Sequence, residues 1–145
     1  MRKLTFTGGV HPYDGKDLSK DKPIISVLPK GELVYPVSQH IGAPATPIVK
    51  KGDRVLVGQK IAEQSGFVSA PVYASVSGTV KAIEPRRVVT GDSVMSIIVE
   101  NDNQYEESQM QPPGPLQTLS REQIIDCIKE AGIVGMGGAG FPTYV

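Results

Sequence analysis

The most constraining feature of this 145-residue chain is a series of short apolar segments between residues 33 and 100, each interrupted by Gly, Pro or Asp. β-Branched residues dominate these segments, and turn signals recur at the spacing expected of small sandwiches and barrels. Strands do not alternate with helical patterns there, so a parallel sheet of βαβ units is not expected. We predict an all-β module with strands at 33–35, 47–49, 54–56, 60–62, 72–73, 78–83 and 94–100.

A motif within this module indicates its type. Gly52-Asp53-x-Val55-x-x-Gly58-Gln59 is followed by Ala70-Pro71 and by Gly78-Thr79-Val80. This pattern resembles the biotinyl/lipoyl-type barrel-sandwich hybrid, or hammerhead, whose carrier members attach their cofactor to a lysine at the tip of the central hairpin. The corresponding connection, residues 64–69, contains no lysine, so neither biotin nor lipoate is expected. A second Gly-Asp pair, Gly91-Asp92, also precedes a valine-led strand and suggests two related halves.

The chain divides into four expected parts. Residues 1–32 are an extended N-terminal lead with one candidate strand at 24–28, and residues 33–100 are the hammerhead. Residues 101–119 are a linker, in which Pro112-Pro113 favours an extended backbone. Residues 120–145 begin a further domain. His11 and His40 lack ligand-like spacing, so we expect both to have packing or turn roles.

A capped helix is predicted at the start of this last part. Ser120-x-x-Gln123 matches a capping box, and Gly132 stands where a C-terminal cap is expected. The apolar residues fall at helical spacing and predict one buried face: Ile124, Ile125, Ile128 and Ala131. Cys127 lies on or beside that face, which indicates a packed thiol rather than a nucleophile.

A glycine-rich stretch follows the helix, from Gly135 to Thr143, with four glycines in six residues. Such a backbone approaches a ligand closely, and consecutive amides in a turn converge on an anion, most often a phosphate. It is not a dinucleotide-binding Rossmann loop, which follows a strand and opens a helix, nor a P-loop, because no Gly-Lys-Ser/Thr occurs. Without further context, a flexible glycine turn is an equally good interpretation.

Composition narrows the function classes. Fifteen basic and fifteen acidic residues cancel, so no nucleic-acid partner is expected. The single cysteine excludes an internal disulfide and a cysteine-only metal or iron–sulfur site in this chain. No segment approaches the ~20 apolar residues that span a bilayer, so no transmembrane segment is expected here.

Four motifs occur together in one order: Gly8-Gly9-Val10-His11-Pro12, Gln39-His40-Ile41-Gly42-Ala43-Pro44, the hammerhead motif, and residues 131–143. From residue 6 to residue 145, this arrangement is similar to RnfC, a component of the Rnf electron transport complex. The last segment also resembles the glycine-rich loop of the flavoprotein of respiratory complex I, which holds FMN and shapes the NADH site. An arginine of that loop is replaced here by Met136, so its contacts are not carried over.

The resemblance implies a mainly β chain, a hammerhead followed by a helix and loop that begin an α/β FMN/NADH-binding domain. It implies part of the NADH-interacting subunit of an ion-translocating ferredoxin:NAD⁺ oxidoreductase, peripheral on the cytoplasmic side of the membrane. Partners would be the other subunits of the complex and NADH, with ferredoxin indirectly. Expected cofactor-binding residues are Gly135, Gly137, Gly138, Ala139, Gly140 and Phe141, with no catalytic or metal-binding residue in this chain.

The cofactors would be FMN and NAD(H), with iron–sulfur clusters held by a downstream region absent here. The sequence therefore resembles an N-terminal fragment, which we expect to be inactive alone and not to retain FMN. Two alternatives stay open: a non-catalytic docking or assembly module, and the related cobalamin reductase of bacterial microcompartments.

Overall fold

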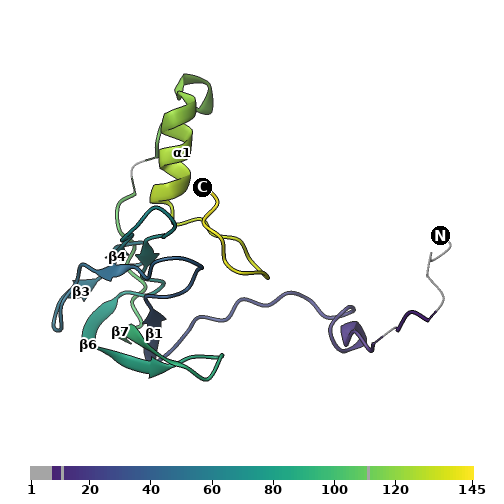
Figure 1. Ribbon diagram of the computed structural model, residues 1–145. Helices are drawn as coiled ribbons and strands as arrows, with labels where there is room; N and C mark the ends of the chain where they lie inside the picture. Colours follow the sequence, from purple (N-terminus) through teal and green to yellow (C-terminus); the bar gives the residue numbers. More distant parts are fainter. Residues whose placement is uncertain (1–7, 11, 111) are drawn as a thin grey trace.

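The computed structural model describes residues 8–10, 12–110 and 112–145, so His11 lies outside the described residues. Each strand expected between residues 33 and 100 is confirmed, with small differences at the ends (Figure 1). The strands are β1 (Glu32–Pro36), β2 (Thr46–Pro47), β3 (Arg54–Val55), β4 (Lys60–Glu63), β5 (Val72–Tyr73), β6 (Gly78–Arg87) and β7 (Ser93–Asn101). The helices are the 3₁₀ turns η1 (Lys16–Leu18) and η2 (Leu116–Thr118) and the α-helix α1 (Arg121–Glu130).

The strands form two antiparallel sheets. One has the order β1-β7-β6-β3, and the other has the order β2-β4-β5. In the larger sheet β6 and β7 form a long hairpin, and β1 lies on the outer side of β7. This mainly β arrangement agrees with the expected barrel-sandwich hybrid.

The core is aliphatic and lies between the two sheets. The most completely buried side chains come from both sheets and the segments between them: Val55, Ile61, Val76, Val80, Ile97 and Val99. Burial of one Val or Ile side chain contributes about 1.5–3 kcal/mol, so these side chains dominate the stability of the fold.

The two Gly-Asp turns have equivalent places in the larger sheet. Gly52-Asp53 precedes β3 and Gly91-Asp92 precedes β7, and these strands pair with β6 from its two sides. Each aspartate carboxylate stabilises its turn: Asp53 accepts a hydrogen bond from the Lys50 amide at 2.9 Å, and Asp92 accepts one from the Thr90 hydroxyl at 2.8 Å. The repeated sequence therefore has a repeated structural task, which is to start a strand beside β6.

The strand predicted at residues 24–28 is wrong. This segment is extended but pairs with no other described segment, and Figure 1 shows the lead running away from the sandwich. Its apolar side chains are exposed, with Ile24 at 102% and Val27 at 77%. The lead joins the sandwich at Pro29, whose carbonyl accepts hydrogen bonds from Asn101 Nδ2 at 2.7 Å and the Tyr105 hydroxyl at 2.6 Å. Strand composition is local, but a strand needs a partner, and the lead has none in the described part of the chain.

The predicted helix caps are confirmed. The Ser120 hydroxyl accepts the Gln123 amide at 3.2 Å, and the Gln123 side chain accepts the Ser120 amide at 2.8 Å. At the other end the Gly132 amide donates to Lys129 O and the Ile133 amide donates to Ile128 O. This double closure is a Schellman motif.

The prediction of a buried helical face is wrong. No residue of α1 is buried, since Ile124, Ile125 and Ile128 are only half-buried, and Ala131 after the helix is exposed. Cys127 is likewise half-buried. Helical spacing correctly groups these side chains on one face but does not determine what covers that face.

Residues 102–108, in the segment expected to be a linker, pack along β3. Asp102 accepts the Ser77 hydroxyl at 2.6 Å and lies 3.2 Å from Arg54 Nη1, while Glu106 pairs with Arg54 Nη2 at 2.7 Å. The Ser77 hydrogen bond, with that from the Gln104 amide, lowers the pKa of Asp102. This part of the chain is thus bound to the sandwich.

Candidate functional site

The glycine-rich stretch forms a closed loop with a β-hairpin-like base. Val134 and Pro142 form an antiparallel bridge, and the Gly135 amide donates to Phe141 O at 2.9 Å. The Thr143 amide closes the base from the other side by donating to Ile133 O at 3.0 Å. Pro142 is fully buried beneath this base. The loop tip is therefore held at both ends, although residues 135–139 are exposed.

The loop tip presents unengaged hydrogen-bond donors. Within the part of the chain that the structure describes, the amides of residues 136–141 donate no hydrogen bond. Gly137 has φ +79°, a left-handed conformation that side chains rarely adopt. A Cβ atom added at Gly138 would meet nothing within 4 Å. The tip thus offers several amides on an open surface, which suits an anionic group.

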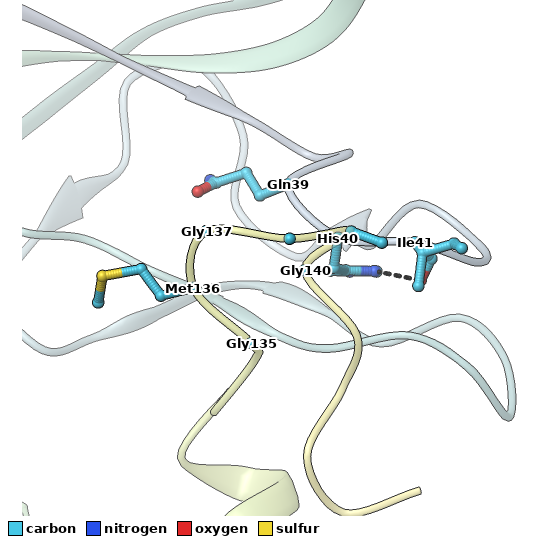
Figure 2. A pocket seen from close by; sticks show the side chains of 9 residues that line it. Gln39, His40, Ile41, Gly135, Met136, Gly137 and Gly140 are labelled. Atoms are coloured by element: carbon cyan, nitrogen blue, oxygen red, sulfur yellow. Dashed lines mark hydrogen bonds between the residues drawn. The ribbon is translucent and has the colours of Figure 1, made fainter. Parts of the chain in front are cut away.

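Residues Gln39, His40 and Ile41 support the loop from the sandwich. The Ile41 amide donates to Ala139 O at 3.1 Å. Gly140 has φ +65°, and a Cβ there would lie 3.1 Å from Gln39 O. These segments line a cavity of about 560 Å³, and Figure 2 shows the loop passing beside Gln39, His40 and Ile41. Two motifs about a hundred residues apart in the sequence, near residues 40 and 138, therefore form one site.

The packing role predicted for His40 is confirmed. Its Nε2 accepts the Ala70 amide at 3.0 Å, so the ring proton lies on Nδ1, which donates to Ile41 O at 3.1 Å. Both ring nitrogens are engaged by backbone groups, and His40 thereby ties the Ile41 segment to Ala70. Sequence reasoning had placed His40 in a motif but had missed its position, with Gln39 and Ile41, against the glycine loop.

The tip of the β4–β5 connection is tied down by other parts of the chain. The Tyr144 hydroxyl lies 2.6 Å from Phe67 O and 3.1 Å from Ser69 O, and the Ala43 amide donates to Val68 O at 2.9 Å. This is the connection that bears the modified lysine in carrier hammerheads. Here its carbonyls instead anchor the segment that follows the glycine loop.

The end of α1 is attached to the smaller sheet. Lys60 Nζ lies 2.5 Å from Glu130 and 3.1 Å from Glu63, and the Tyr73 hydroxyl donates to Glu130 O. Burial lowers the pKa of Lys60, but its hydrogen bonds to Glu130 and Glu63 outweigh this and raise the pKa above its ordinary value. Burial also raises the pKa of Tyr73. These contacts fix the direction in which the chain leaves α1 and enters the loop.

The described residues contain no group of three His, Cys, Asp or Glu side chains that could hold a metal ion. Nor is any helix in that part of the chain long and apolar enough to cross a bilayer, since α1 has ten residues.

Fold and site together define a lysine-free barrel-sandwich hybrid that is joined through a short helix to a glycine loop with unengaged amides. The family described as the RnfC barrel sandwich hybrid domain matches residues 4–104. The chain belongs to this RnfC family.

Curated relatives carry the similarity beyond that domain, and each is the C component of its complex. Over 142 residues the chain is 46% identical to that of the Na(+)-translocating ferredoxin:NAD(+) oxidoreductase complex of Acetobacterium woodii, covering 97% of this chain and 32% of the relative. It is 44% identical to that of the proton-translocating ferredoxin:NAD(+) oxidoreductase complex of Clostridium ljungdahlii, covering 97% of this chain and 31% of the relative. That of the ion-translocating oxidoreductase complex of Vibrio cholerae is 44% identical over 95% of this chain and 18% of its own length. The chain thus spans a third or less of these relatives.

Proposed function

We propose that this chain is part of the NADH-interacting subunit of a membrane-associated ferredoxin:NAD⁺ oxidoreductase that couples electron transfer to ion translocation. The observation that carries the proposal is the 46% identity to the C component of such an oxidoreductase complex, which continues through the glycine loop to cover 97% of the chain. Its partners would be the other subunits of the complex, with ferredoxin as an indirect partner. Its place would be peripheral, on the cytoplasmic side of the membrane.

In this proposal the loop holds the phosphate of FMN or of the nicotinamide nucleotide. The amides at Gly137, Gly138, Ala139 and Gly140 would donate to phosphate oxygens, and they fit that task because none of them is engaged within the described residues. Gly135 and Phe141 would close the base of the site through their mutual hydrogen bond. The helix and loop would be the start of an α/β FMN/NADH-binding domain.

The chemistry assigned to this chain is placement. A bound flavin supplies hydride and single-electron chemistry, and the protein supplies binding, orientation and electrostatics. The bonds from Ile41 to Ala139 and from Tyr144 to the β4–β5 connection hold the loop against the sandwich, so its amides are oriented before a ligand arrives. Iron–sulfur clusters would be held elsewhere in the subunit.

A Gly138→Val variant of the full-length subunit tests this proposal. Gly138 has no positive φ and no neighbour within 4 Å of an added Cβ, so the substitution should preserve the fold while filling the space over the loop amides. We expect flavin content and NADH oxidation to fall sharply. Met136→Gln is the matched control, because Met136 lies in the same loop and its side chain is 99% exposed. Unchanged flavin content and NADH oxidation in a folded Gly138→Val subunit would refute the proposal.

A second candidate function is that of a docking module for other subunits of the complex. It is favoured by the exposed lead, in which Ile24, Ile25 and Val27 are at least three-quarters exposed. Contiguous exposed apolar side chains commonly mark interaction sites. Replacing Ile24 and Val27 with Ser should weaken binding in a titration against partner subunits without changing flavin content. Equal binding by the substituted and unsubstituted chains would argue against docking through the lead.

A further inference from the structure

A second cavity adjoins the glycine loop. It has a volume of about 720 Å³ and lies between the loop and the β6–β7 hairpin. Gln39 and Gly138 line both this cavity and the one beside His40. A ligand bound at the Gly138 amide therefore has a direct path to the end of the β6–β7 hairpin.

Arg87, at the end of β6, lines this second cavity. The first cavity is lined by Gln39, His40, Ile41 and residues 135–140, which include no lysine or arginine, and both ring nitrogens of His40 are engaged by backbone groups. Among the described residues that line the two cavities, Arg87 thus supplies the one permanent positive charge. Asp92 lines the same cavity, and its carboxylate accepts the Thr90 hydroxyl.

The guanidinium of Arg87 is available to a ligand. Its Nε donates to Gly91 O at 3.3 Å, which orients the group and leaves the two terminal nitrogens. Arg87 is exposed and forms no ion pair with another described residue. Its neighbour Arg86 differs, because it lies 3.0 Å from Glu84 and 3.8 Å from Glu32.

The loop alone cannot neutralise a phosphate. Its amides provide partial charges, and Met136 adds neither a charge nor a donor. A phosphate monoester or a pyrophosphate carries about two negative charges, and arginine is the side chain best suited to bind such a group through two parallel hydrogen bonds. An unpaired arginine that lines a cavity shared with Gly138 meets this requirement.

We propose that Arg87 binds the phosphate of the nucleotide held at the glycine loop. This inference rests on the proposed function, since it names the counter-charge of the same site. The hammerhead then contributes directly to nucleotide binding, because Arg87 belongs to β6 of the sandwich. The phosphate comes from either a flavin mononucleotide or a nicotinamide dinucleotide.

An Arg87→Gln variant of the full-length subunit tests the proposal, with Arg86→Gln as the matched control. We measure the affinity for FMN, the affinity for riboflavin, which has no phosphate, and the KM for NADH. A charge-assisted hydrogen bond accounts for about a tenfold to hundredfold change in affinity. A loss of this size for FMN but not for riboflavin assigns Arg87 to the flavin phosphate. A rise of this size in the KM for NADH alone assigns it to the dinucleotide.

Two outcomes would overturn the inference. One is an Arg87→Gln subunit with unchanged FMN affinity and unchanged KM for NADH. The other is an equal loss for FMN and riboflavin, which indicates a change in folding instead of a lost phosphate contact. Gly138→Val separates this inference from the proposed function, because ligand binding that depends on Gly138 but not on Arg87 removes Arg87 and leaves the loop site standing.

Discussion

Replacing Gly140 with alanine should detach the glycine loop from the sandwich. Gly140 has φ +65°, and a Cβ there would lie 3.1 Å from Gln39 O and 3.2 Å from His40 Cα. The left-handed conformation costs an alanine about 1–2 kcal/mol, and the contacts add to this cost because the neighbours are backbone atoms. A change of 1–2 kcal/mol alters an equilibrium by a factor of about 5–30.

Hydrogen exchange of the Ile41 amide measures this detachment, since that amide donates to Ala139 O in the loop. In the Gly140→Ala chain we expect Ile41 to exchange about 5–30-fold faster, because local opening is favoured by the strain in the closed state. The Ala74 amide, which donates to Gln59 O inside the sandwich, should keep its rate.

Gly138→Ala is the matched control, because Gly138 has no positive φ and an added Cβ there meets nothing within 4 Å. It should leave the exchange of Ile41 nearly unchanged. The reasoning would be refuted by an unchanged Ile41 rate in Gly140→Ala, or by equal acceleration in the two variants.

Three further predictions concern stability. Ile61→Ala should lower the free energy of unfolding by about 2–5 kcal/mol in urea because Ile61 is fully buried, whereas Ile25→Ala, at a side chain 75% exposed, should change it little. Comparable losses would contradict the assigned core. Asp102→Asn should remove a contribution that depends on pH: the lowered pKa of Asp102 stabilises the native chain above the ordinary value of 3.8 and ceases to do so as the pH falls below it. A stability difference between the two chains that stays constant across this range would count against it. Tyr144→Phe should speed exchange of the Gly135 amide, and no effect there would exclude the anchoring role of the Tyr144 hydroxyl.

Local features of the fold could be predicted from the sequence. The short strands follow from β-branched residues between turn residues, and the capping box follows from Ser120 and Gln123, because each depends on neighbours within a few positions. The same local reasoning failed at residues 24–28 and at the apolar face of α1. Both failures concern what lies opposite a segment, which periodicity does not encode.

The candidate site was predictable only in part. The glycine stretch was found because glycine clusters are conspicuous and amides bind anions. Its support by Ile41 and its proximity to Arg87 depend on packing between segments far apart in the sequence. The arginine pair gave no local signal that one side chain is ion-paired and the other is not.

The pairing of β1 with β7 has a consequence for the order of folding. Because β6 and β7 are joined by a short turn, their hairpin can form locally, whereas β1 must close a long loop to place Pro36 opposite Ser96. We expect β1 amides to gain protection after those of β6 and β7 in pulse-labelled refolding, and the reverse order would contradict this. The glycine loop rests on residues 39–41, which directly follow β1. During synthesis the nucleotide site can therefore assemble only after the earliest strand of the sandwich has found one of its latest.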